Sequence, residues 1–295
     1  MTRAPEESAG VGVRVLTEEE LAAWLRERGR RIVFSRGRFW ADNWGFFRLL
    51  HFSATMPADR LGRPSGTCWA YNALLPDDDA LKANAWYPLH LVRDLVGFDE
   101  TRLDASARKQ LRRCRATLRL IRVSDPDLLR AQGWDVFSQN ARRLRLETGV
   151  TQKQYLAGVE SLVTDTRRLI LGAMDGDRLV AYLETYAVED TAYLDTIRLS
   201  DESLSLHVSG FLHYQASQLY RQSGLVKQVC AGPPRPERMG ISEFKRRWGM
   251  PIVPMPARFW SPAPFRTLLK VARPGAYYRA TGVPPPGTSP DGVQS

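Results

Sequence analysis

Residues 167–200 read RRLILGAMDGDRLVAYLETYAVEDTAYLDTIRLS, and this stretch decides the fold class. The hydrophobic period changes here from that of a helix, about 3.6 residues, to that of a half-buried strand, about 2. The apolar runs are separated by MDGD and by Glu189-Asp190, both typical of tight hairpin turns. The pattern therefore predicts three consecutive antiparallel strands, at 167–174, 177–188 and 191–200.

Helical and strand-like segments surround this meander. Residues 17–28 predict a helix whose capping box is formed by Thr17 and Glu20. Gly149 and Gly224 are placed to end two further helices. The predicted helices lie at 102–118, 126–149, 152–165 and 203–223, and the other strands at 31–34, 48–54, 67–75, 118–123, 225–232 and 258–260. This order predicts an α/β (α+β) protein with a mixed, mainly antiparallel central sheet that helices flank.

The composition is that of an ordinary globular chain. Of the 295 residues, 43% are hydrophobic and 25% charged, and no apolar run approaches the roughly 18–20 residues that a membrane span needs. Cys68, Cys114 and Cys230 lie far apart, which argues against a metal site or a disulfide framework and for a reducing compartment. The N-terminus has no basic start followed by an apolar block, so we expect no secretory signal and a cytoplasmic location.

The formal net charge of +10 indicates an anionic partner, such as nucleic acid, a phosphorylated cofactor or a membrane surface. The alternative is a general excess of arginine on a solvated surface. The clearest cluster lies in the predicted helix 102–118. Its residues Arg108, Arg112, Arg115 and Arg119 share one helix face, and the planar guanidinium suits phosphate or carboxylate. This face is either an anion-binding surface or a solvated helix surface.

Two stretches, SARKQLRRCRAT (106–117) and QVCAGPPRPERMGISEFKRRWG (228–249), resemble motifs of a known superfamily. The first resembles the basic helix that opens the second domain of Fem-type aminoacyltransferases and their GNAT-like relatives. The second resembles the closing motif of that group: a strand, a Gly-containing loop, then Gly-Ile-x-x-Phe-Lys-x-x-x-Gly. The resemblance covers about residues 100–260, and the order of the strand meander is also that of the GNAT fold.

The resemblance and the composition together predict four parts of the chain. These are a disordered N-terminus (1–14), an N-terminal subdomain that could be a degenerate GNAT-like copy (15–104), a GNAT-like acyltransferase domain (105–260) and a basic, proline-rich tail (261–295). The resemblance implies no permanently bound cofactor, with acyl-CoA or aminoacyl-tRNA as co-substrate. Lys245 would hold an anionic part of the substrate with Arg108 and Arg112, in one cleft. Arg246 and Arg247 are expected to face solvent.

One segment departs from the pattern that the resemblance implies. GNAT enzymes hold the coenzyme A pyrophosphate at a Gly-rich turn that opens a helix, where backbone N–H groups and the helix dipole receive phosphate. The corresponding segment here, SDESLSLHVSG (200–210), carries Asp201 and Glu202 and no Gly-rich run. These carboxylates would oppose a pyrophosphate, which favours the Fem-like branch, with an aminoacyl-tRNA or another anionic donor held by side chains.

The predicted hairpin at 177–200 brings two further candidate catalytic carboxylates together. If Glu189 and Asp190 form a two-residue tip, the numbers of paired residues sum to about 379, so Glu184 faces Asp195 and Tyr186 faces Tyr193. Facing carboxylates raise one another's pKa, which suits a general base for an attacking amine. The alternative is that both carboxylates face solvent or bind an arginine.

His207, near the start of the predicted helix 203–223, is a third candidate for proton handling; its alternative is a packing role. The aromatic run 39–47 could stack on bases, although core packing is favoured. We therefore predict a GNAT-like N-acyltransferase in which an amine attacks an acyl or aminoacyl donor directly. The competing prediction is a non-catalytic GNAT-fold module that binds RNA or an acidic polymer. The acceptor, the acyl group and the oligomeric state stay open.

Overall fold

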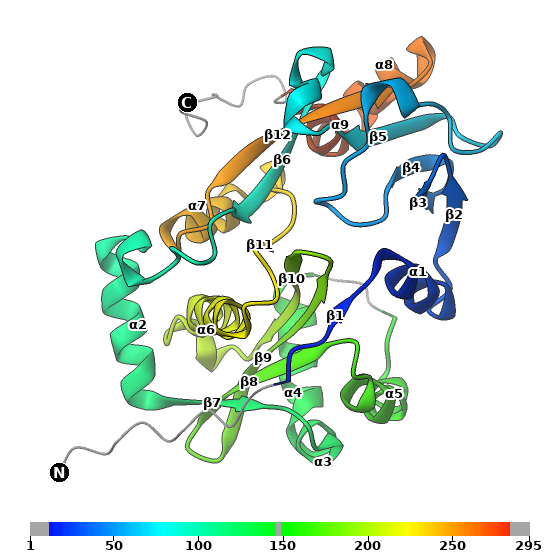
Figure 1. Ribbon diagram of the computed structural model, residues 1–295. Helices are drawn as coiled ribbons and strands as arrows, with labels where there is room; N and C mark the ends of the chain where they lie inside the picture. The colour runs from blue at the N-terminus through cyan, green and yellow to red at the C-terminus, as the bar shows by residue number, and fades with distance from the viewer. Residues whose placement is uncertain (1–11, 146–148, 284–295) are drawn as a thin grey trace. The chain divides into compact units, whose positions relative to one another are not determined.

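The computed structural model describes residues 12–145 and 149–283 (Figure 1). The predicted disorder at 1–14 falls largely on residues outside this range. Two compact units are present, and each draws on separated parts of the chain. The first unit comprises Leu95–Asp99 and Gln110–Lys227 with the residues up to Val15, and the second comprises Leu16–Asp94, Glu100–Lys109 and the chain from Gln228. The architecture is mixed α/β with mainly antiparallel sheets that helices flank, as predicted.

The sheet of the first unit contains the meander that the sequence predicts. Its strands β7 (Leu118–Arg122), β8 (Leu169–Asp175), β9 (Arg178–Val188) and β10 (Thr191–Leu199) follow one another in chain order. Every neighbouring pair among these four is antiparallel. The two hairpin tips contain Gly176 and Glu189, both with positive φ, as tight turns require.

The register of the β9–β10 hairpin agrees with the prediction only near its tip. Tyr193 faces Tyr186, and their rings stack with centroids 5.0 Å apart. The register then shifts between Leu194 and Thr196, so Glu184 faces Thr196 and Asp195 has no direct partner across the pair. The predicted Glu184–Asp195 pairing is therefore wrong, because a β-bulge inserts one residue that the simple sum of residue numbers does not contain.

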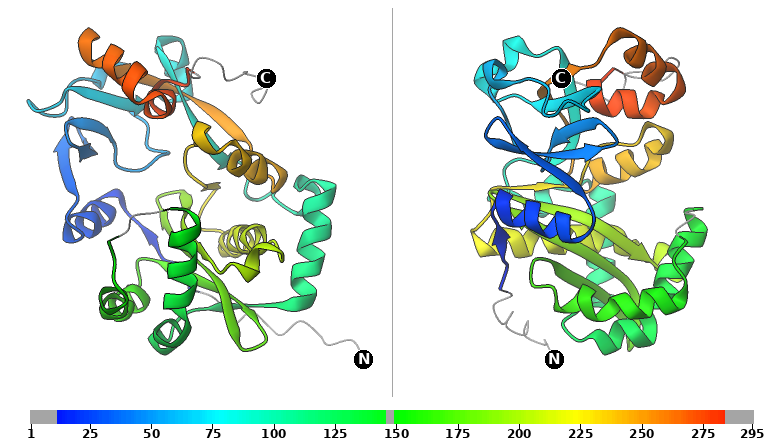
Figure 2. Two further views of the ribbon diagram at one scale, coloured as in Figure 1. Left: turned by 180° about the vertical axis from the view of Figure 1, so that it is seen from behind. Right: turned by 90° about the vertical axis from the view of Figure 1, so that its right-hand side faces the viewer.

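The two faces of this sheet are covered by different helices. Tyr182 packs with α4 (Trp134–Arg143) and α5 (Gln152–Thr164) in one hydrophobic cluster. Thr185, three residues further along β9, lies on the opposite face, where its hydroxyl is 2.9 Å from the Tyr220 hydroxyl of α6 (Val208–Ser223). The alternation of strand side chains thus assigns α4 and α5 to one face and α6 to the other. The ribbon views in Figures 1 and 2 show the same arrangement.

Three helix boundaries differ from those predicted. Within the predicted helix 126–149, a short helix, α3 (Pro126–Leu128), runs through one π-helical stretch into α4, which ends at Arg143. Residues 146–148 lie outside the described range, and Gly149 does not end the helix, although its φ is positive. The helix predicted at 203–223 begins only at Val208, after a 3₁₀ turn. The helix predicted at 102–118 is α2 (Ala105–Thr117), capped by Asp104, whose carboxylate accepts from Ala107 N–H at 2.7 Å.

Seven paired strands lie in the second unit, and they neighbour one another in the order β2-β3-β4-β5-β12-β6-β11. The strands are β2 (Arg31–Ser35), β3 (Arg38–Asn43), β4 (Phe46–Leu49), β5 (Ala70–Leu74), β6 (Ala85–Val92), β11 (Gln228–Cys230) and β12 (Ile252–Trp260). All neighbouring pairs are antiparallel except β4 and β5, which are parallel. The strand predicted at 48–54 is wrong beyond Leu49, and β6 was not predicted.

The helices of this unit are α1 (Glu18–Glu27), α7 (Met239–Arg247), α8 (Ala263–Ala272) and α9 (Pro274–Thr281), and a short strand, β1 (Val15–Leu16), precedes α1. The predicted capping box of α1 is present. Both α8 and α9 lie in the stretch predicted as a proline-rich tail, so regular structure extends past residue 260. Figure 2 shows these two helices beside each other, and α9 contacts β6 and β12. Residues 284–295 lie outside the described range.

Candidate functional site

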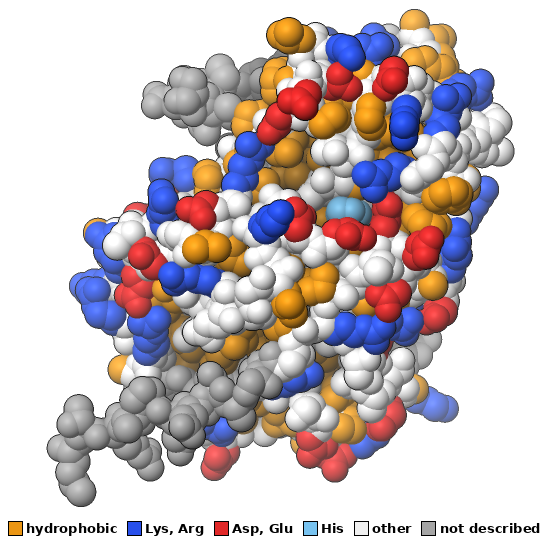
Figure 3. All heavy atoms as spheres, in the orientation of Figure 1, with side chains coloured by type: hydrophobic (Ala, Val, Ile, Leu, Met, Phe, Trp, Pro, Cys, Tyr) orange, Lys and Arg blue, Asp and Glu red, His pale blue; other side chains and the backbone are white. Residues whose placement is uncertain are grey.

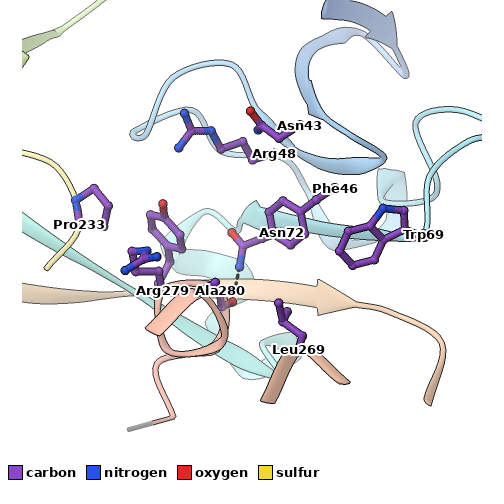
Figure 4. Close-up of a pocket in the computed structure, with 11 residues that line it drawn as sticks. Asn43, Phe46, Arg48, Trp69, Asn72, Pro233, Leu269, Arg279 and Ala280 are labelled. Carbon is purple, nitrogen blue, oxygen red and sulfur yellow. Dashed lines mark hydrogen bonds between the residues drawn. The ribbon is translucent and has the colours of Figure 1, made fainter. Parts of the chain in front are cut away.

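A pocket of about 380 Å³ lies in the second unit, between its sheet and helices α8 and α9 (Figure 4). Its polar lining consists of Arg48 from β4, Asn72 from β5, Tyr87 from β6, Arg279 from α9, and Asn43 at the end of β3. Its apolar lining includes Phe46, Trp69 and Leu269. Among the described residues that line the pocket, none is acidic. The pocket therefore combines two cations with aromatic walls.

Strand alternation explains why these side chains line the pocket. Phe47 and Leu49 of β4 belong to a buried cluster with Trp40 and Tyr71. The residues between and beside them, Phe46 and Arg48, point to the opposite face of the sheet, as successive strand residues do. In the same way Asn72 lies opposite the neighbouring Tyr71, and its amide donates to Ala280 O of α9 at 2.5 Å. One face of the sheet thus forms the core, and the other forms the floor of the pocket.

The arginines give the pocket a positive character. Arg48 and Arg279 come from separate elements, and in Figure 4 their guanidinium groups extend toward the side of the pocket where Pro233 lies. Burial raises the pKa of the Tyr87 hydroxyl, and the charge of Arg48 opposes this rise. The Arg48 Nε is buried and has no hydrogen-bond partner within the described part of the chain. A buried donor of this kind favours an acceptor such as phosphate or carboxylate.

Lys245, which the family motif singles out, lies in a second cluster of the same unit. Its Nζ donates to Ala231 O at 2.6 Å. Burial lowers the pKa of Lys245 to about 8. Phe244 and Trp248 of the same helix contact each other, with ring centroids 6.2 Å apart, and Trp248 is buried. The aromatics hold α7 against the core and keep the ammonium partly out of water.

His90 of β6 is a second titratable group of this cluster, which also contains Cys230, and it is fully buried. Its Nδ1 lies 2.9 Å from Met250 O, and its Nε2 lies 3.1 Å from Ser242 Oγ. A carbonyl only accepts, so Nδ1 carries the proton and Nε2 accepts from the serine hydroxyl. Burial, reinforced by the Lys245 charge, lowers the pKa of His90 to about 4. The sequence did not indicate the contact between His90 and Ser242, because these two residues are 152 positions apart.

The start of α2 and the end of α7 are joined within the second unit. Arg247 Nε donates to Asp104 Oδ2 at 3.0 Å, and Asp104 N–H donates to Arg247 O at the same distance. Burial raises the pKa of Asp104, but hydrogen bonds from Ala107 N–H and from Arg247 lower it further, so the net direction is downward. Arg247 is thus partly exposed and ion-paired, and it does not face solvent alone. Arg246 is exposed and pairs with Glu243.

Arg108 and Arg112 have different surroundings although they share α2. Arg108 Nη1 donates to Leu103 O at 2.6 Å, so one of its donors serves the backbone of the helix start. Arg112 is exposed. It belongs to the first unit, whereas Lys245 belongs to the second. Their convergence on one cleft, and their role with Arg108 in donor binding, stay predictions.

The three predicted proton-handling residues lie in the first unit. Glu184 forms an ion pair with Arg168 at 2.8 Å, and both side chains are largely buried. This is the arginine-bound alternative for Glu184. Asp195 is the exposed bulge residue, and it accepts a hydrogen bond from Thr196 Oγ1 at 3.3 Å. His207 is exposed and has a positive φ of 55° directly before α6. Their catalytic roles stay predictions.

The acidic segment before α6 is less repulsive to phosphate than its sequence indicates. Asp201 binds Arg142 at 3.0 Å and Arg143 at 2.8 Å, and Arg143 also donates to Leu199 O. These hydrogen bonds, that from Arg143 first, lower the pKa of Asp201. Glu202 pairs with Arg178. Three arginines from other parts of the chain thus pair with the two carboxylates of this segment. The repulsion that the sequence predicts between this segment and a phosphorylated donor is therefore weaker.

The described residues contain no group of three or more His, Cys, Asp or Glu side chains that could hold a metal ion. No helix among them is long and apolar enough to cross a bilayer. The cysteine thiols are buried, and burial raises the pKa of both Cys114 and Cys230 to about 11, so neither is a ready nucleophile.

Several solved structures resemble the chain. The C-terminal domain of a protein named as a lysylphosphatidylglycerol synthetase from Agrobacterium fabrum matches with a TM-score of 0.54, 14% identity, and coverage of 90% of this chain and 97% of that domain. L-PGS from Bacillus licheniformis matches with a TM-score of 0.51, 13% identity, and coverage of 89% and 99%. Over about nine-tenths of its length the chain thus shares the mixed α/β fold of these two structures.

FemX is also similar, with a TM-score of 0.50 and 10% identity over 69% of this chain and 75% of that protein. Neither a protein-family profile nor a curated protein matches the sequence. At these identities the likeness establishes the fold, and function must be argued from the residues.

Proposed function

We propose that the protein is an acyltransferase that moves an acyl or aminoacyl group to an acceptor whose anionic group binds between Arg48 and Arg279. The observation that carries the proposal is the pocket itself, in which two guanidinium groups, two amides and a phenol line a space with aromatic walls. Pockets of this size, mostly apolar with a few placed polar groups, are typical substrate sites.

The chemistry that we propose is direct attack. The acceptor's amine nitrogen forms a bond to the donor's carbonyl carbon, the carbon–sulfur or carbon–oxygen bond to the donor breaks, and the leaving group takes up a proton. The amine loses its proton to a base, for which Glu184, Asp195 and His207 are the candidates. Orientation of two bound reactants supplies a large part of the acceleration in reactions of this class.

The donor is acyl-CoA or aminoacyl-tRNA, and we favour the aminoacyl donor. One neighbour that spans nearly the whole chain is named as a lysylphosphatidylglycerol synthetase, and FemX has the name of the branch that the motifs at 106–117 and 228–249 resemble. The predicted donor-binding residues are Arg108, Arg112 and Lys245. If the neighbours' names also apply to the acceptor, its nucleophile would be a lipid hydroxyl instead of an amine.

The test is product formation by the purified chain. Acyl-CoA thioesters and aminoacyl-tRNAs are supplied in turn with an amine or phosphatidylglycerol as acceptor, and products are measured by mass spectrometry. We expect a new amide or ester with one donor class, reduced at least tenfold in Arg48→Met and Arg279→Met. The matched control is Arg122→Met, an exposed arginine of β7 in the other unit. Turnover that is unaffected by both pocket variants would contradict the proposal.

A second candidate is the non-catalytic module that binds RNA or an acidic polymer. It is favoured by the internal partners of two candidate site residues, since Glu184 is paired with Arg168 and Lys245 with a carbonyl. RNA binding that weakens steeply with salt, without turnover of any donor, would identify this alternative.

A further inference from the structure

The α8 surface, defined here as α8 together with Trp44, exposes apolar side chains that a water-facing surface does not require. Trp44 is 91% exposed, Val271 is 76% exposed and Leu268 is 60% exposed. The three described residues of α8 with large exposed apolar side chains, Phe265, Leu268 and Val271, are spaced three apart and so lie along one side of the helix. None of the α8 residues is buried.

Contacts in the second unit connect Trp44 to α8. Trp69 Nε1 donates to Trp44 O at 2.6 Å, and the Trp69 ring lies 5.6 Å from that of Phe265. Trp69 also lines the arginine pocket together with Leu269 of α8. The exposed apolar side chains are thus attached to the wall of that pocket.

The turn that carries Trp44 is firmly held. Trp44 has a φ of 57°, which is uncommon for a bulky residue, and Gly45 follows with a φ of 83°. Asp42 Oδ1 accepts from Gly45 N–H at 2.6 Å. A Cβ at position 45 would lie 2.5 Å from Trp69 Cδ1, so glycine is required there. The fold therefore holds a large aromatic ring in water at a strained position.

The chain segment that carries α8 has charges of one sign. Residues 244–290 contain no Asp or Glu, and α8 and its neighbourhood carry Arg266, Lys270, Arg273 and Arg279. On the face drawn in Figure 3, hydrophobic and basic side chains lie at the top, where Figure 1 places α8, with some acidic side chains among them. An amphipathic helix with aromatic and aliphatic residues on one side and cations beside them is typical of segments that lie in a bilayer interface.

We propose that the α8 surface docks on an anionic lipid bilayer, with Trp44, Leu268 and Val271 in the interface and Lys270 and Arg273 facing the headgroups. Charge complementarity selects this partner, because the segment that carries α8 is basic and contains no acidic residue, which suits anionic headgroups. The docking deepens the proposed function, since a bilayer could present a phospholipid headgroup to the adjacent pocket. It does not depend on transfer activity.

Flotation with lipid vesicles tests the docking without any donor or acceptor turnover. The full chain is mixed with vesicles of phosphatidylcholine alone or with about 30% phosphatidylglycerol, at low and high salt. We expect the protein to float with the anionic vesicles, and high salt to weaken the association because it screens the headgroup charge. Leu268→Ser/Val271→Ser should reduce partitioning about tenfold, and Lys270→Glu should reduce it in anionic vesicles only.

The matched control is Leu81→Ser/Val96→Ser, which removes a leucine and a valine that are at least as exposed but lie outside the α8 surface. In a second readout, brominated lipids should quench tryptophan fluorescence in the wild type and less in Trp44→Phe. Equal flotation of the α8 and control variants, or no flotation at all, would overturn the proposal. So would a dimer in solution that the α8 variant converts to a monomer, because the apolar face would then bind a second copy. If the protein transfers acyl groups but does not bind vesicles, only the docking proposal is contradicted. If it binds vesicles but transfers no acyl group, only the proposed function is contradicted.

Discussion

The pH dependence of folding offers a quantitative test of the buried cluster around His90. The imidazole has a pKa of about 4 in the folded protein, against an ordinary value of 6.5, because burial and the Lys245 charge disfavour the protonated form. Between these two values the unfolded chain binds a proton that the folded chain does not. Stability from this group is therefore present above pH 6.5 and is lost as the pH falls toward 4.

The size of this effect follows from the two pKa values. Lowering the pH from 7 to 5 should remove about 2 kcal/mol of folding free energy through His90. Lys245 stays protonated and Cys230 stays neutral over this range, since their pKa values are about 8 and about 11, so neither contributes to the change.

Urea denaturation of the wild type and of His90→Asn at pH 7, 6 and 5 isolates this term, because other titrating groups cancel in the difference. The stability advantage of the wild type should shrink by about 2 kcal/mol between pH 7 and 5. His207→Asn, at an exposed histidine, serves as the matched control. A difference between wild type and His90→Asn that stays constant within about 0.5 kcal/mol would refute the buried, neutral imidazole.

Three further perturbations follow from the structure. The pKa of Lys245 is lowered from 10.5 to about 8, so the folded protein loses this proton at lower pH than the unfolded chain does. Between pH 8 and 10 the free energy of unfolding of the wild type, measured by urea denaturation, should therefore rise by about 2 kcal/mol relative to that of Lys245→Met. No rise would show that the ammonium group is solvated. Glu184→Ala should cost about 3 kcal/mol because it removes the nearer of the two carboxylates that pair with the buried Arg168, whereas Asp195→Ala at the exposed bulge should cost less than about 0.5 kcal/mol; equal costs would contradict the buried Glu184–Arg168 ion pair. Gly45→Ala should lower the free energy of unfolding by about 2 kcal/mol or more, since its Cβ meets Trp69; an unchanged chemical-denaturation midpoint would count against this turn.

The meander and most helices could be predicted because their signals are local. Alternation at 177–188 and the Glu189-Asp190 tip fixed the strands and the Tyr186–Tyr193 contact. The capping residues of α1 and the position of Gly224 likewise lie within a few residues of the helix ends that they determine. Such features depend on the chain's immediate neighbourhood, which the sequence displays directly.

The bulge and the pocket could not be predicted, because each depends on distant partners. The register shift before Thr196 leaves no mark in residues 191–199 that distinguishes it from regular pairing. β6 contains a proline and an interrupted apolar pattern, and it becomes a strand through pairing with β12, more than 150 positions later. The aromatic run 39–47 was expected to pack mainly in the core. Trp40 and Phe47 do so, whereas Phe46 lines the pocket and Trp44 faces water.

The partners of the arginines also explain why composition alone was a poor guide to the site. The most conspicuous cations, on α2 and α7, include Arg108 and Arg247, which serve neighbouring backbone or carboxylate groups. Arg48 and Arg279 stand in unremarkable sequence contexts, and only the fold brings them to one pocket. An unusually high net charge thus indicated an anionic partner without locating it.

The most direct test of the central claim is the kinetics of Arg279→Met and Arg48→Met with the donor and acceptor that give a product. If the arginine pocket holds the acceptor's anionic group, KM for the acceptor should rise at least tenfold in each variant, while KM for the donor stays within about twofold of the wild type. An unchanged acceptor KM in both folded variants would show that the acceptor binds elsewhere.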